Sequence, residues 1–139
     1  MKSNQILFAF LIGLLSNITF AADVTLEVNN VISDRGHIVA ALCERGEVFP
    51  RKCARVTRES ALKSVTKLYF KNVPKGTFAI TVFHDENDDG KLNVDASNIP
   101  AEGYGFSRDA VGHFGPPKFD DAAVAVIDGN NQFTINLIY

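Results

Sequence analysis

Short runs of alternating apolar and polar residues, separated by turn residues, constrain the fold of this chain more than any other feature. Every second side chain is apolar at residues 24–28 and again at 78–82. A period of two is typical of a strand with one buried face. Residues 37–43 (HIVAALC) are mostly apolar, which favours a central strand. Further strands are expected at 68–70, 124–127 and 133–137, the last two joined as a closing hairpin by Asp128-Gly129-Asn130.

Turn residues, rather than helices, separate these expected strands. Ser33–Gly36 and Asn72–Gly76 have the composition of turns. Only residues 58–67 have weak helical spacing, so at most one short helix is expected there. Short strands without helices between them predict an all-β fold, an antiparallel β-sandwich of about seven strands of the immunoglobulin-like or transthyretin-like type.

The N-terminal residues 1–21 have the pattern of a secretory signal peptide. Lys2 supplies a positive charge, residues 6–15 (ILFAFLIGLL) are apolar, and Thr19-Phe20-Ala21 resembles a cleavage site. A membrane-spanning helix needs about 20 apolar residues, so this run is too short to span a bilayer. We expect cleavage after Ala21, which leaves a single periplasmic or secreted domain over 22–139 without a membrane span; the alternative is a buried core helix.

The charge of the chain excludes one class of partner. Among 139 residues, Lys and Arg number 14 and Asp and Glu number 16, for a net charge of −2. A nucleic-acid-binding protein would carry a basic surface, so no nucleic acid partner is expected. Apolar residues make up 46% and charged residues 22%, the balance of a globular protein.

Two cysteines, Cys43 and Cys53, follow the predicted signal peptide. An oxidising compartment favours a disulfide between them, and Gly46 and Pro50 allow the segment between them to turn. Two free thiols or a metal pair are the alternatives. A zinc site is disfavoured because no histidine lies near the two cysteines in the sequence.

The Gly/Pro-rich segment 85–121 interrupts the rhythm of strands, and a loop of this length in a small domain usually carries function. Its first part places side-chain oxygens at alternate positions, at Asp85, Asn87, Asp89, Asn93 and Asp95, with Gly90 sixth and the Lys91 backbone carbonyl seventh. This spacing resembles a calcium loop, because calcium takes six to eight oxygen ligands. Ala96 stands where an EF-hand has Glu. The alternative to a structural calcium site is a solvated turn in which Asp and Asn accept hydrogen bonds from backbone amides.

Four blocks of sequence resemble the domain of unknown function 2141 family of exported bacterial proteins. They are residues 73–80 (VPKGTFAI), 83–92 (FHDENDDGKL), 99–107 (IPAEGYGFS) and 115–122 (GPPKFDDA). Asn93 stands where the family pattern more often has Asp, and the two cysteines are not part of that pattern. The first block also resembles the Pro-Gly hairpin of transthyretin-like sandwiches. The resemblance implies an exported β-sandwich without an established activity.

Histidines provide the only candidates for catalysis. His84 lies at the end of an expected strand beside Asp85, and His113 lies in the Gly-rich segment near Arg108. A small periplasmic hydrolase that uses His84, His113 and Arg108 is one hypothesis, because some transthyretin-like sandwiches hydrolyse purine derivatives. The C-terminal Tyr-Arg-Gly-Ser signature of those enzymes is absent from this chain. The sequence therefore favours a binding or structural module over an enzyme.

Aromatic residues of the same segment are candidates for ligand contacts. Tyr104, Phe106 and Phe114 alternate with Gly and Pro, and aromatic side chains on rigid loops often line binding sites. The alternative is that they fold back and close one end of the sandwich. The expected partner is a small ligand or a protein of the cell envelope.

Overall fold

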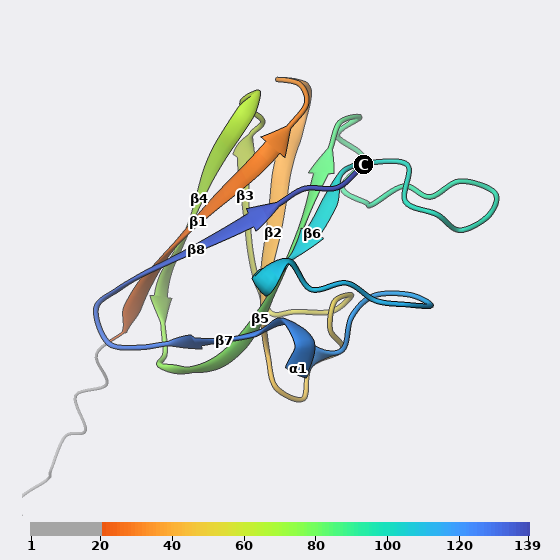
Figure 1. The fold of residues 1–139 in the computed structure, drawn as a ribbon. Coiled ribbons are helices and arrows are strands. Elements are labelled where there is room, and N and C mark those ends of the chain that lie inside the picture. The colour runs from red at the N-terminus through yellow and green to blue at the C-terminus, as the bar shows by residue number, and fades with distance from the viewer. Residues whose placement is uncertain (1–20) are drawn as a thin grey trace, which may run out of the picture.

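Two sheets packed face to face form the architecture of the computed structural model, which describes residues 21–139 (Figure 1). The elements are β1 (Ala22–Val31), β2 (His37–Glu44), β3 (Arg55–Ser60), β4 (Ser64–Val73), β5 (Gly76–Asp85), β6 (Tyr104–Phe106), η1 (Ser107–Asp109), α1 (Phe119–Ala122), β7 (Ala123–Val126) and β8 (Asn130–Asn136). The predicted all-β sandwich is confirmed, with eight strands in place of about seven. The predicted signal peptide lies outside the described residues, apart from Ala21.

The smaller sheet has the order β4-β1-β8, and the larger one the order β3-β2-β5-β6. Strand β7 also pairs with β5, so β7 and β6 lie one after the other along the same edge of β5. All pairs but one are antiparallel. The exception is β1 with β8, where Leu26 faces Phe133 in a parallel ladder, so the sheets are not purely antiparallel as expected.

The prediction of a closing hairpin at the C-terminus was wrong. Strand β7 pairs with β5 in the larger sheet, and β8 pairs with β1 in the smaller one. Between the two strands, the chain crosses from one sheet to the other. The buried side chain of Asn131 closes this crossing, because its amide donates to the Ile127 carbonyl and its oxygen accepts from the Ile127 amide, both at 2.9 Å.

The short helix considered at residues 58–67 was also wrong. Strand β3 ends at Ser60 and β4 begins at Ser64, with a sharp corner between them. Thr66 stabilises this corner, because its hydroxyl oxygen accepts a hydrogen bond from the Leu62 amide at 2.9 Å. Ala61 at the corner is buried and packs against the core.

Inward-facing side chains of both sheets form one hydrophobic core. The largest fully buried apolar residues are Leu26, Ile38, Leu42, Leu68, Ile80, Ile135, Leu137, Val24, Val28, Val73 and Val82. They alternate with outward side chains along β1, β2, β4 and β5, as the period-two pattern predicts. The prediction that residues 133, 135 and 137 share a buried face is confirmed, with Phe133 only partly buried.

The predicted disulfide is confirmed between Cys43 and Cys53, whose Cα atoms lie 4.7 Å apart. Cys43 is the second-last residue of β2, and Cys53 lies in the segment between β2 and β3. Closing a loop of this length stabilises a domain by about 2.5–3 kcal/mol in the chain-entropy model. The turn between β2 and β3 is therefore held against the larger sheet.

The buried position of Leu137 in the core can be tested by mutation. This side chain is 2% exposed, so Leu137→Ala leaves a cavity and is expected to lower the free energy of unfolding by about 2–5 kcal/mol. The matched control is Leu62→Ala, because Leu62 is 58% exposed and the same truncation there should cost little. Urea unfolding of both variants measures the difference, and equal losses would contradict the position of Leu137 in the core.

Candidate functional site

The outer face of the larger sheet is apolar where its central strands meet. Val39 and Ala41 of β2 point away from the core, because the buried residues of this strand are the alternate ones. Val39 lies opposite Phe83 and Ala41 opposite Thr81 on β5, while Val56 of β3 pairs with Ala41. The sheet register thus places these side chains side by side on one surface, which we call the floor.

A cleft of about 790 Å³ lies over this floor. Three segments contribute its walls: residues 90–100 between β5 and β6, residues 110–116 between η1 and α1, and the disulfide-closed segment with Pro50 and Arg51. The first two segments project from the same side of the sandwich (Figure 1). The cleft is therefore built from the sheet and from loops that are distant in sequence.

Hydrogen bonds from η1 hold the second of these segments in place. The carboxylate of Asp109 accepts from the backbone amide of Asn136 at 2.9 Å and from its side-chain amide at 2.6 Å. The buried Ser107 hydroxyl accepts from the Ile80 amide at 2.9 Å and donates to the Ala122 carbonyl. The segment after η1 consequently starts from a fixed position between the two sheets.

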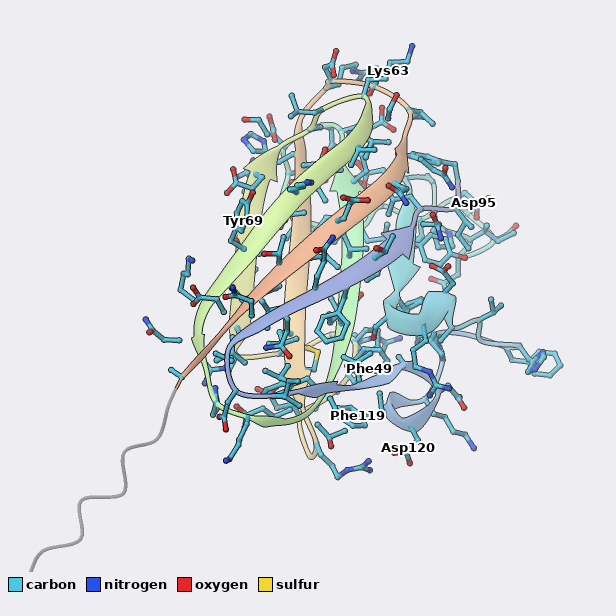
Figure 2. All side chains as sticks on the ribbon, turned by 60° about the vertical axis from the view of Figure 1, so that its left-hand side comes forward. Phe49, Lys63, Tyr69, Asp95, Phe119 and Asp120 are labelled. Carbon is cyan, nitrogen blue, oxygen red and sulfur yellow. A yellow bond between two sulfur atoms is a disulfide. The ribbon has the colours of Figure 1, made fainter. Side chains whose placement is uncertain are left out.

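A second, smaller hydrophobic cluster adjoins the cleft. Phe49 makes edge-to-face contacts with Phe106 and Phe119, with ring centroids 5.8 Å and 6.1 Å apart. Ala79 and Ala122 complete the buried part of the cluster. Figure 2 shows Phe49 and Phe119 close together at the end of the sandwich where the disulfide lies. The disulfide thus helps to position Phe49 within this cluster.

The three predicted aromatic contacts occupy different environments. Tyr104 is half-buried and lines the cleft. Phe106 also lines it but belongs mainly to the cluster around Phe49. Phe114 is fully exposed and does not line the cleft. Tyr104 thus borders the cleft, and Phe106 packs with Phe49 at one end of the sandwich. Ligand contacts by these residues stay a prediction.

The acidic loop is closed at its start by the buried carboxylate of Asp85. Its two oxygens accept hydrogen bonds from the backbone amides of Asp89 and Gly90, at 3.1 Å and 2.9 Å. Glu102, which is 6% exposed, accepts from the amides of Glu86 and Asn93, both at 3.0 Å. Sequence analysis missed Glu102, whose one signal is a carboxylate in an otherwise uncharged stretch.

Three of the predicted calcium ligands lie together within this loop. The side-chain amide of Asn93 donates to Asp89 at 2.8 Å, and that of Asn87 donates to both Asp89 and Asn93, at 3.3 Å and 3.1 Å. The hydrogen bond from Asn93 and a further one from the Lys91 backbone amide hold the pKa of Asp89 below its usual value.

Asp95 instead closes the next turn, where its carboxylate accepts from the amides of Ser97 and Ile99 at 2.8 Å and 3.0 Å. Within residues 21–139, no group of three or more His, Cys, Asp or Glu side chains is arranged to hold a metal ion. The carboxylates of the loop thus accept backbone amides, as in a self-capped turn. Calcium binding stays a prediction.

His84 is fully buried and uses both of its ring nitrogens. Nε2 donates to the Arg35 carbonyl at 2.7 Å, and Nδ1 accepts from the Tyr139 hydroxyl at 2.8 Å. A carbonyl only accepts hydrogen bonds, so Nε2 carries the proton. The turn before β2 packs closely against the end of β5. Only glycine fits at Gly36, because its φ is +66° and a Cβ at this position would lie 2.0 Å from the Asp85 carbonyl oxygen. Burial raises the pKa of Tyr139.

The other two residues of the hydrolase hypothesis lie elsewhere. His113 is exposed in the segment after η1, and the Arg108 guanidinium donates to the Asp120 carbonyl at 3.4 Å. No hydrogen bond within residues 21–139 joins the side chains of His84, His113 and Arg108. None of the three lines the cleft. Their geometry lends the hydrolase hypothesis no support.

The structure instead pairs His37 with a carboxylate. His37 Nδ1 contacts Asp88, and the Arg58 guanidinium donates to the same carboxylate oxygen at 2.7 Å. The hydrogen bond from His37 is the main cause that holds the pKa of Asp88 below its usual value. His37 and Arg58 lie on the outer face of the larger sheet, and Arg58 pairs with Val39. This polar cluster borders the floor at the end opposite the cluster around Phe49.

Residues 26–134 match a family described as an uncharacterized protein conserved in bacteria (DUF2141). No curated protein and no solved structure matches the chain. The matched span runs from β1 to β8 and includes the acidic loop, the floor and all three wall segments. Because this span is well over half of the sequence, the chain belongs to the DUF2141 family of bacterial proteins.

Proposed function

We propose that this protein is an exported module that binds a small, predominantly apolar ligand in the cleft above the larger sheet. The observation that carries this proposal is the cleft itself. Its volume of about 790 Å³ falls within the range of about 300–1,000 Å³ that is typical of small-molecule sites. Its lining is mostly apolar with few polar groups, among them Thr81, Asn98 and the Tyr104 hydroxyl, which is the usual composition of such sites.

Exposed apolar side chains on the floor and the walls of the cleft support the same proposal. Val56 is 60% exposed, Ile99 59% and Val111 70%, and each comes from a different segment around the cleft. Covering apolar surface is favourable by about 25 cal/mol per Å². A ligand that covers these side chains would therefore gain free energy that the unliganded protein does not have.

Fixed walls also favour binding, because less conformational freedom is lost when a ligand is taken up. The disulfide restrains the segment with Pro50 and Arg51. The buried carboxylates of Asp85 and Glu102 restrain the loop between β5 and β6. The binding space is in this way largely preformed.

A neutral apolar fluorophore, N-phenyl-1-naphthylamine, tests the cleft. Its fluorescence should rise on mixing with the protein, because the probe moves from water into an apolar site. Val39→Asp places a carboxylate in the middle of the floor and should weaken binding about tenfold or more, since an apolar ligand would have to displace the water around this charge. Val65→Asp, on an exposed position of β4 in the other sheet, is the matched control and should bind as the unmodified protein does. Equal binding by both variants, or none by the unmodified protein, would overturn the proposed function.

Export to the periplasm or the medium is supported by two features. The sequence begins with the pattern of a signal peptide, and the structure contains a disulfide, which an oxidising compartment favours. Among residues 21–139, no helix is long and apolar enough to cross a membrane.

Mass spectrometry of the protein purified from its host without reductant tests export. The chain should begin at Ala22 and lack the two hydrogen atoms that the disulfide removes. An intact N-terminus in protein recovered from the cytoplasm would show that the proposed export is wrong.

Calcium bound by the acidic loop is the structural part of the proposal. The proximity of the Asn87, Asp89 and Asn93 side chains, which hydrogen-bond to one another in the loop that Asp85 closes, supports it, because each of them carries an oxygen that a calcium ion can use. Extracellular modules bind calcium with dissociation constants of about 0.1–1 mM, so the gain in stability near 1 mM is expected to be about 0.4–1.4 kcal/mol.

Thermal unfolding in EDTA and in about 10 mM calcium measures this gain. Asp89→Ala should abolish the gain. Asp34→Ala is the matched control, because Asp34 accepts the Lys63 amide in a different turn and its loss should leave the gain intact. An equal melting temperature in both solutions would show that the loop is a turn that binds no calcium.

A further inference from the structure

We infer that the ligand of the cleft is an amphipathic anion, with its apolar part on the floor and its negatively charged group at one of the two cations of the lining, Arg51 or Lys91. This inference rests on the proposed function of the cleft and adds the chemical class of the ligand. It follows from the charges of the residues that line the cleft and from their surroundings.

Among residues 21–139, the only charged residues in the lining are the two cations Arg51 and Lys91. No Asp or Glu of this part of the chain lines the cleft, although acidic residues outnumber basic ones in the full sequence, 16 to 14. Within residues 21–139, neither Arg51 nor Lys91 forms an ion pair. An anionic group would therefore find two cations without carboxylate partners.

The nearby acidic loop does not remove this positive charge from the cleft. The carboxylates of Asp85 and Glu102 are buried and accept backbone amides of the loop. Asp89, which lies between these two residues in the sequence, accepts hydrogen bonds from the side-chain amides of Asn87 and Asn93. The Lys91 ammonium attracts Asp89 only weakly, after these hydrogen bonds, and Asp89 is not part of the lining.

The positions of charge and apolar surface fit a ligand with two ends. Arg51 and Lys91 are both exposed, so a charged group beside them keeps contact with water and pays little for desolvation. The floor residues Val39, Ala41 and Phe83 are half-buried and can cover an apolar chain or ring. A small inorganic anion would leave the floor uncovered, and a cationic ligand would be repelled by both cations.

Two fluorophores with the same aromatic framework separate charge from apolar binding. N-phenyl-1-naphthylamine is neutral, and 8-anilinonaphthalene-1-sulfonate is the same molecule with a sulfonate. The unmodified protein should bind the sulfonate several-fold more tightly, and this preference should shrink as salt is added, because exposed charges are screened. The double variant Arg51→Gln/Lys91→Gln should bind the sulfonate about fivefold to tenfold more weakly and the neutral probe with unchanged affinity.

The matched control is Lys52→Gln/Lys63→Gln, which removes the same net charge at two exposed lysines outside the lining. Lys63 lies at a tip of the sandwich (Figure 2). This variant should keep the preference for the sulfonate. If both probes bind equally to the unmodified protein, or if the control loses the preference as fully as the cleft variant, the inference about charge is wrong while the cleft stands. If neither probe binds, the proposed function itself fails.

Discussion

The fold depends on burying both faces of β2 and β5, the two central strands of the larger sheet. Their inward side chains, such as Leu42 and Ile80, fill the core against the smaller sheet. Several of their outward side chains, among them Val39, Ala41 and Phe83, are apolar as well, so this part of the outer face needs a cover of its own. At one end of that face the cover is the cluster around Phe49, which the disulfide helps to hold. Beyond this cluster the cover is incomplete, and the opening is the cleft.

The loop that forms the largest wall owes its order to buried carboxylates rather than to a core of its own. A backbone amide that is cut off from water needs a partner, and a buried carboxylate needs donors. Asp85 and Glu102 meet both needs, since each accepts two amides of the loop. A Gly/Pro-rich segment that would otherwise be costly to order is thereby fixed beside the floor. Removing either carboxylate would leave amides unpaired as well as the loop unanchored.

The local sequence predicted the positions of several strands well, but it predicted less well which strands pair with each other. Alternation identified β1 and β5, and a mostly apolar run identified β2. The position of the two cysteines after a signal-like segment favoured the disulfide. The crossing after β7 was missed because a Gly-containing turn between two apolar runs is typical of a hairpin. It is the Asn131 side chain, rather than a ladder between β7 and β8, that closes it.

The site was harder to predict because it is assembled from distant segments. His37 and Asp88 are 51 residues apart, and nothing near His37 in the sequence indicates a carboxylate partner. The same holds for the cleft. One of its wall segments precedes β5 in the sequence, one lies between β5 and β6, and one follows β6. One local signal did exist. Residues 37–43 are apolar on both faces, which indicates that the outer face of the strand is covered, but not by what.

The exposed apolar residues around the cleft contribute little to the stability of the fold. Val111 and Ile99 belong to neither hydrophobic cluster, and their exposed surface gains nothing from the core. Polar residues at these positions would give the sandwich the same stability, since polar side chains on a loop are fully solvated. Exposed apolar groups that gather around a preformed opening are typical of surfaces that bind. Together with the two cations in the lining, they support the proposed occupant, which is apolar over most of its length and negatively charged at one end.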